Sequence, residues 1–145
     1  MVASNGTFIH TNSTATLGAQ LPANSTAWEA ICDSTKKERY GQVNTRDVLS
    51  KLTMIPIETW SYKDDPNHIK HIGPMAQDFY AAFHVGESDT TISTLDPDGV
   101  ALAAIQELAK QNEQKDTKIT ELEARVKQLE AAILQFGNLT QTDKQ

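Results

Sequence analysis

The chain has 145 residues, of which 39% are hydrophobic, and its mean hydropathy is −0.45. This is enough for one modest domain with an extended appendage, but not for a large enzyme core. The formal net charge of −6 at pH 7 argues against nucleic acid and anionic membranes as partners, because both favour a basic surface. We also expect no membrane span and no signal peptide, so another protein chain is the expected partner.

The composition changes near residues 30 to 36. Residues 1 to 35 contain no Lys or Arg, and all 13 basic residues lie from Lys36 onward. The early part has one plausible strand, Thr7–His10, and too few large apolar residues to fold alone. We interpret residues 1–31 as the end of an upstream stalk, β-rich or extended, that needs partner chains.

Short elements are predicted in the middle of the chain. Asn44 can cap a short helix that Pro56 must end. The β-favouring stretches Ile57–Lys63 and Ile69–Ile72 flank the turn signal Asp64–Asn67, which predicts a β-hairpin.

A second short helix is predicted from Pro74, with Gly86 as its C-terminal cap. A short strand is then predicted at Thr91–Leu95, and Asp98 can cap the helix that follows. Four aromatic side chains of the hairpin and short helix should form a small core rather than a ligand cage: Trp60, Tyr62, Phe79 and Phe83.

A heptad pattern predicts a long helix over residues 98–136. Apolar side chains recur there in alternating steps of three and four, the spacing of coiled-coil positions a and d. Gly137 should end this helix, which leaves residues 137–145 as a frayed tail. With Ile119 at position a, the predicted oligomer seam contains Ile105, Leu108, Asn112, Ile119, Leu122, Val126, Leu129 and Ile133.

Two polar residues, Asn112 and Lys115, interrupt the seam. A polar residue at position a often fixes register and oligomer state at some cost in stability. Asn112 is therefore either an alignment device or a local loosening of the seam, and the pattern leaves both open.

Flanking charges predict that the helices run parallel. In a parallel, in-register coiled coil each g residue faces the e residue five positions later on the neighbouring chain. Lys118 would then face Glu123, and Arg125 would face Glu130, so both pairs are complementary. The branched residues at a with Leu at d favour two chains by the usual rule.

Other candidate sites carry less weight. His68 and His71 lie near two aspartates but have a spacing more often due to chance than to metal binding. Asp96–Gly99 is similar to part of a calcium loop, yet its third acidic position and distal Glu are missing. We therefore predict no metal and no cofactor. Cys32 is the single cysteine, so no intrachain disulfide can form.

Several sequence blocks together resemble a known family. Two are specific, His71–Phe79 (HIGPMAQDF) and Asp98–Gln106 (DGVALAAIQ), and they follow Cys32–Glu38, Val48–Leu52 and Ile57–Lys63 in the family's order and spacing. This pattern, over about residues 31–135, resembles the C-terminal intramolecular chaperone and self-cleaving domain of phage endosialidases, tailspikes and tail fibres, which also occurs in cellular surface proteins.

The resemblance implies an α+β fold, in which a small β-hairpin and short helices pack around the base of a long helix. It implies a parallel three-stranded coiled coil, and so a homotrimer in place of the two chains that the a and d residues favour. The expected regions are the upstream end 1–31, a small α+β chaperone region 32–97, the coiled-coil helix 98–136 and the tail. Such domains hold three copies of an upstream β-rich stalk in register while it folds. The partners implied are other copies of the chain and its own upstream segment, in a virion appendage or a surface protein.

The resemblance also implies self-cleavage. In the family a serine attacks the peptide bond before itself, assisted by a lysine five residues later. Here Cys32 stands at the nucleophile position and Lys37 at the lysine position, so the bond would be Ile31–Cys32. A lysine acts as a base only when neutral, so burial or a neighbouring cation such as Lys36 would have to lower its pKa from about 10.4.

Cysteine in place of serine leaves two outcomes open. A thiol is the better nucleophile, yet a site shaped for a hydroxyl can be inert with sulfur. Ser34 lies off the pattern and is a weak substitute. The alternatives are thus a self-processing chaperone and a non-cleaving trimerisation cap. The resemblance also offers a third reading from the family's cellular relatives, a coiled-coil domain that activates a membrane-bound regulator by cutting it, but nothing in residues 1–30 supports a DNA-binding part.

Overall fold

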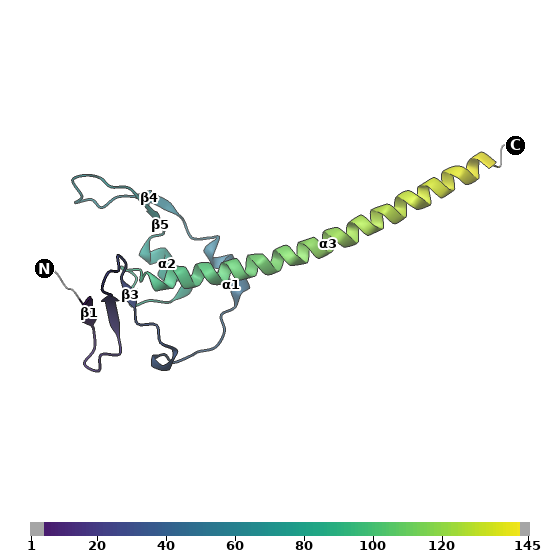
Figure 1. The fold of residues 1–145 in the computed structure, drawn as a ribbon. Helices are drawn as coiled ribbons and strands as arrows, with labels where there is room; N and C mark the ends of the chain where they lie inside the picture. The colour runs from purple at the N-terminus through teal and green to yellow at the C-terminus, as the bar shows by residue number, and fades with distance from the viewer. Residues whose placement is uncertain (1–4, 143–145) are drawn as a thin grey trace. The chain divides into compact units, whose positions relative to one another are not determined.

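The computed structural model describes residues 5–142, with side chains described through residue 136 (Figure 1). The chain divides into two compact units, Met1–Gln42 and Val43–Gln145, and each is described by itself. This division falls later in the chain than the change in composition, so that Cys32 and Lys37 both lie in the first unit.

The first unit contains a three-stranded antiparallel sheet. Its strands β1 (Thr7–His10), β2 (Gly18–Leu21) and β3 (Glu29–Ala30) pair in the order β1-β2-β3. The predicted first strand is confirmed, whereas β2 and β3 were not predicted. Several large apolar side chains of this unit are more than half exposed, namely Phe8, Ile9, Leu17 and Trp28, whereas Leu21 and Ile31 are partly buried.

The connection between β1 and β2 is held by one amide side chain. The Oδ1 atom of Asn12 accepts hydrogen bonds from the backbone N–H groups of Thr16 and Leu17, at 3.0 and 3.1 Å. Gly18 follows, and a Cβ there would overlap the carbonyl of Ile9 across the strand pair. The hairpin thus depends on local polar contacts and on the close approach of the Gly18 backbone to the Ile9 carbonyl. Neither feature produces a hydrophobic pattern in the sequence.

The second unit contains α1 (Thr45–Leu52), β4 (Glu58–Trp60), β5 (His71–Gly73), α2 (Ala76–Phe83) and α3 (Leu95–Thr142). It confirms the α+β class and the short elements around the base of a long helix. Asn44 caps α1 as predicted, accepting the N–H of Asp47 at 3.2 Å. The hairpin is also confirmed, as the antiparallel pair β4–β5.

Helix α1 packs against the base of α3 and against α2. The buried apolar side chains of this unit come from these three helices and the loop after α1, and they are Val48, Ile55, Phe79 and Ala104. Because this core is small, most of α3 extends beyond it (Figure 1).

The predicted aromatic core is partly wrong. Phe79 is buried, and its ring centroid lies 5.0 Å from that of Phe83. Trp60 instead packs within the hairpin, 4.7 Å from the His71 ring and 5.1 Å from the Tyr62 ring, and Tyr62 is 66% exposed. Trp60 is partly buried at the end of β4, whereas Tyr62 lies two residues beyond that strand, where the alternation no longer sets its direction.

The predicted end of the second short helix and the predicted strand after it are both wrong. Helix α2 ends in the left-handed residue His84 rather than at Gly86, and histidine is among the residues that adopt this conformation more readily. Thr91–Leu95 forms no strand, since the Ser88 hydroxyl bonds the hydroxyls of Thr90 and Thr91 in a local turn.

The long helix also has different ends. It begins at Leu95, so Asp98 lies within its first turn instead of capping it. It continues through Gly137 to Thr142, because one glycine costs a helix only about 1 kcal/mol. Residues 143–145 of the predicted tail lie outside the described residues.

Candidate functional site

Cys32 and Lys37 lie in direct contact. The Lys37 Nζ atom donates a hydrogen bond to the Cys32 Sγ atom over 2.8 Å. The structure therefore brings the predicted nucleophile and the predicted base together from five residues apart. Both side chains are exposed, and Cys32 is a free thiol.

A short 3-10 turn, η1 (Ser34–Lys36), produces this contact. The Lys36 N–H donates to the carbonyl of Asp33 at 3.1 Å, and the Lys37 N–H donates to the carbonyl of Ser34 at 3.4 Å. Asp33 caps the turn, because its Oδ1 accepts the Thr35 N–H at 2.9 Å and its Oδ2 accepts the Thr35 hydroxyl at 2.8 Å. These bonds from the Thr35 backbone and then its hydroxyl lower the pKa of the Asp33 carboxyl, with a smaller contribution from Lys36.

The arrangement can exchange a proton between sulfur and nitrogen. An amine within hydrogen-bond reach of a thiol is the geometry that nucleophilic catalysis requires. Lys37 reaches the sulfur of Cys32, while no described hydrogen bond involves the hydroxyl of Ser34. The predicted pair is thus assembled, and the off-pattern serine is not part of it.

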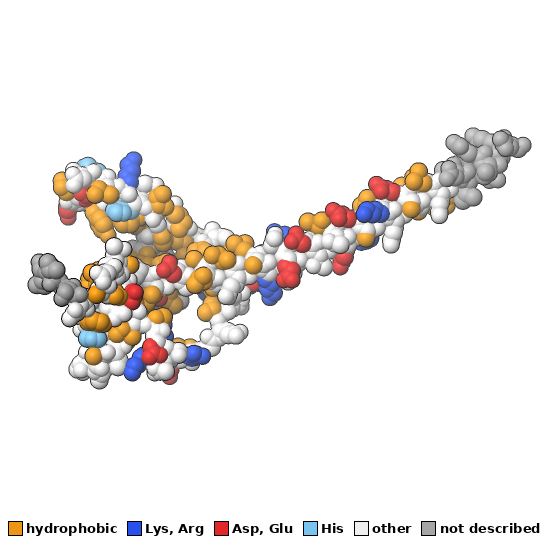
Figure 2. All heavy atoms as spheres, in the orientation of Figure 1, with side chains coloured by type: hydrophobic (Ala, Val, Ile, Leu, Met, Phe, Trp, Pro, Cys, Tyr) orange, Lys and Arg blue, Asp and Glu red, His pale blue; other side chains and the backbone are white. Residues whose placement is uncertain are grey.

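The predicted seam of α3 is uncovered in the single chain. Ile105 and Leu108, nearest the base, are 59% and 52% exposed. Further along the helix, side chains of the same stripe are also about half exposed or more: Ile119, Leu122, Val126, Leu129, Ile133 and Phe136. Figure 2 shows apolar side chains alternating with charged ones along this helix. Asn112 and Lys115 line the same stripe and have no hydrogen-bond or ion-pair partner among the described side chains.

Helix α1 covers a different stripe of α3. Glu107 is only 4% exposed there, and its carboxylate accepts the Thr45 hydroxyl at 2.8 Å and the Gln111 amide at 3.0 Å. Those two hydrogen bonds, the one from Gln111 first, lower the pKa of Glu107, and the neighbouring cations Lys110 and Arg46 add to the effect. Glu107 is therefore a buried carboxylate that ties the N-terminus of α1 to α3.

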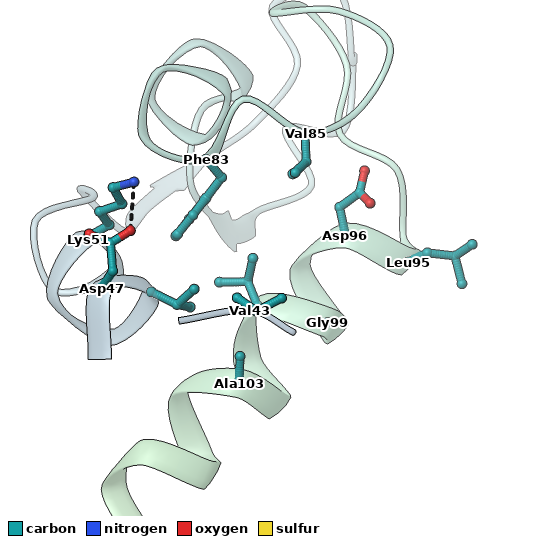
Figure 3. A pocket seen from close by; sticks show the side chains of 11 residues that line it. Val43, Asp47, Lys51, Phe83, Val85, Leu95, Asp96, Gly99 and Ala103 are labelled. Atoms are coloured by element: carbon teal, nitrogen blue, oxygen red, sulfur yellow. Dashed lines mark ion pairs between the residues drawn. The ribbon is translucent and has the colours of Figure 1, made fainter. Parts of the chain in front are cut away.

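A hollow of about 360 Å³ lies between α1, the end of α2 and the base of α3 (Figure 3). Phe83 and Val85 project toward it, and the ion pair between Asp47 and Lys51, 2.8 Å long, lies at its edge. Apart from this ion pair and Asp96, its lining is largely apolar.

Within residues 5–136, no group of three or more His, Cys, Asp and Glu side chains is placed to hold a metal ion. None of the described helices has a stretch both long and apolar enough to cross a membrane. His71 packs on the Trp60 ring, as expected for a structural residue.

Taken together, these features define a class: a small α+β module at the base of a long helix whose apolar stripe is exposed, preceded in the sequence by a thiol that contacts an amine. The model of the family described as the chaperone of endosialidase matches residues 32–85, which is consistent with the resemblance seen in the sequence. The match begins at Cys32 and ends before α3. No curated protein and no solved structure matches the chain.

Two residues with defined roles in the structure, Asp33 and Glu107, were not predicted from the sequence. Asp33 precedes Ser34-Thr35, and an aspartate before short hydroxyl residues is a known signal for a side-chain-capped turn. Glu107 carried no such signal, because its burial depends on where α1 docks along α3.

Proposed function

We propose that the chain is a homotrimeric intramolecular chaperone that registers and assembles an upstream β-rich segment and cleaves itself between Ile31 and Cys32. The family match supports the general chaperone role. The main observation in support of the trimer is the long exposed apolar stripe of α3, because a helix in water with such a stripe gains stability by burying it.

The position of α1 supports oligomerisation through this stripe. Helix α1 packs on the side of α3 that carries Ala104 at position g and Glu107 at position c, whereas positions a and d remain open. At about 100° per residue, the covered and open stripes are centred about 100° apart around α3. The chain thus folds its own elements onto one side of the helix and leaves the other side for neighbouring copies.

The charges beside the stripe favour a parallel, in-register arrangement. In the single chain Lys118 bonds Glu121 at 3.0 Å, with both side chains more than half exposed. Such an exposed pair contributes about 0–1 kcal/mol, so Lys118 can exchange it for Glu123 of a second copy at little cost. The pair of Arg125 with Glu130 of a second copy repeats the pattern one heptad later.

A parallel trimer gives the upstream segments what they need to fold. Local helical contacts form quickly, whereas pairing between β-rich chains is slow and prone to aggregation. A helical clamp raises the effective concentration of the three upstream segments and fixes their register. Removing the clamp afterwards prevents the stalk from unfolding along the same route, which increases its kinetic stability.

The proposed cleavage is an N-to-S acyl transfer followed by hydrolysis. Neutral Lys37 accepts the thiol proton, and the Cys32 sulfur attacks the carbonyl carbon of Ile31. The Ile31–Cys32 amide bond then breaks, its nitrogen takes the proton from Lys37, and a thioester joins Ile31 to the sulfur. Water hydrolyses the thioester, leaving a carboxylate at Ile31 and a free amine and thiol at Cys32.

A second candidate function is a non-cleaving trimerisation cap that stays attached to its stalk. The exposure of both Cys32 and Lys37 favours it, because the single chain does not desolvate the lysine. This candidate shares the trimer and the chaperone role and differs only in lacking the cut.

Intact mass measurement of the expressed chain tests the cleavage. We expect a fragment beginning at Cys32 that appears faster as the pH is raised, since a lysine becomes neutral at alkaline pH. Cys32→Ala and Lys37→Ala should abolish it, while Ser34→Ala, the matched control, should leave it unchanged. Persistence of the full-length chain at every pH would support the non-cleaving cap instead.

A further inference from the structure

The five-residue spacing of Cys32 and Lys37 does not by itself bring their side chains together. In an extended chain five residues span roughly 17 Å, whereas a 3-10 turn rises only about 2 Å per residue. The turn Ser34–Lys36 shortens this path, and Lys37 leaves it in an extended conformation, with φ −117° and ψ 136°. The contact between sulfur and amine therefore depends on that turn.

One side chain holds the turn. Both carboxylate oxygens of Asp33 are bonded to Thr35, one to its N–H and one to its hydroxyl, and the Asp33 carbonyl accepts the Lys36 N–H. The cap satisfies a backbone N–H that a single turn cannot satisfy internally. Thr35 is exposed, so no packing replaces these bonds if they are lost.

We propose that Asp33 is a positioning residue for the self-cleavage: it caps the turn that places the Lys37 amine on the Cys32 sulfur. This inference rests on the proposed function, because it concerns the same pair of residues. Asp33 touches neither reacting atom, so its whole effect passes through Lys37.

The first test measures cleavage of the full chain by intact mass. Asp33→Ala should slow the appearance of the Cys32 fragment by on the order of 10²-fold, the typical loss when a reacting group is displaced by about 1 Å. Asp33→Asn should restore cleavage, since asparagine caps as well as aspartate. Glu38→Ala, which removes an exposed carboxylate beside Lys37, should change nothing. Unaltered cleavage in Asp33→Ala, or failure of Asp33→Asn to restore it, would overturn the proposal.

A second test works even if the chain does not cleave. Cys32 is the only thiol, so the rate of alkylation by iodoacetamide reports on it alone. The Lys37 amine donates a hydrogen bond to the Cys32 sulfur, and a thiol that loses an adjacent cation is less reactive, so Lys37→Ala should slow alkylation near neutral pH. Asp33→Ala should slow it to the same degree, Asp33→Asn should not, and Asp33→Ala should have no further effect when Lys37 is already alanine.

The outcomes separate the two proposals. Slower alkylation in Asp33→Ala without any cleavage would support the positioning role and contradict self-cleavage. Cleavage that requires Cys32 and Lys37 but not Asp33 would contradict the positioning role alone. An additive loss of alkylation in the double variant would show that Asp33 acts by another route, and would also overturn the inference.

Discussion

Glu107 shows how one side chain can couple two helices. Its carboxylate is buried, yet it is ionised and hydrogen-bonded on both oxygens, to Thr45 of α1 and to Gln111 of α3 itself. A buried carboxylate without such bonds would be strongly destabilising, so the docking of α1 depends on both donors.

The stability of the protein should therefore depend on pH through Glu107. Because folding lowers the pKa of this carboxyl, its contribution is present at neutral pH and is lost as the pH falls through about 4 and below. Glu107→Gln should lower the thermal unfolding midpoint at pH 7, and the difference should narrow as the pH is lowered below about 4. The measurement is circular dichroism at one fixed protein concentration. If the difference in thermal midpoint grew on acidification, the predicted role of Glu107 would be contradicted.

The core at the base of α3 is small enough for one residue to matter. Phe79 is 4% exposed, so Phe79→Ala should lower the free energy of unfolding by about 3–5 kcal/mol in denaturant titrations. Met54→Ala, at a side chain that is 72% exposed, is the control and should change it by less than about 0.5 kcal/mol. Equal effects of the two variants would contradict the burial of Phe79 in this core.

Residue patterns predicted some of these features and missed others. The contact of Cys32 with Lys37 was expected from the family resemblance, and the Asn44 cap from a local rule. The burial of Glu107 and the exposure of Tyr62 depend on which surfaces meet in the folded chain. The identity of a single residue does not reveal which surface of the folded chain it will meet.

At the scale of elements, helices with strong periodicity were predicted well and their ends were not. Helix α3 extends past both predicted ends, because a glycine or an aspartate near an end only shifts the balance by about 1 kcal/mol or less. Strand β2 (Gly18–Leu21) was missed because the Asn12 contacts, which no hydrophobic alternation reveals, set up its pairing with β1.

Substitution of Asn112 tests whether this polar residue aligns the helices or only loosens the seam. Asn112→Ile should raise the thermal midpoint, because it removes a polar group from position a. If Asn112 aligns the helices, the variant should also form a mixture of oligomers in sedimentation velocity. A variant that stays a single species would show that the residue only loosens the seam.

The charges flanking the seam test the direction of the helices. Glu123→Lys with Glu130→Lys should destabilise the oligomer by a few tenths of a kcal/mol per pair. Adding Lys118→Glu and Arg125→Glu should restore the thermal midpoint, since each g residue again meets an opposite charge. If the fourfold variant remained as weak as the twofold one, parallel in-register pairing would be contradicted.

At the scale of the whole molecule, the single chain leaves its longest apolar surface open. The stripe from Ile105 to Phe136 spans on the order of 48 Å at about 1.5 Å per residue, and none of the elements described in the second unit covers it. The a and d residues favour two chains and the family resemblance implies three, so the sequence alone did not decide the number. That number depends on how complete helices pack together.

Sedimentation equilibrium of the full chain, across a range of concentrations, tests the trimeric chaperone most directly. The account predicts a species of three times 16.0 kDa, or three times the fragment mass if cleavage has occurred. Leu122→Asp, which places a charge in the middle of the seam, should shift the mass toward that of a single chain. A clean dimer, or a monomer that persists at high concentration, would contradict it.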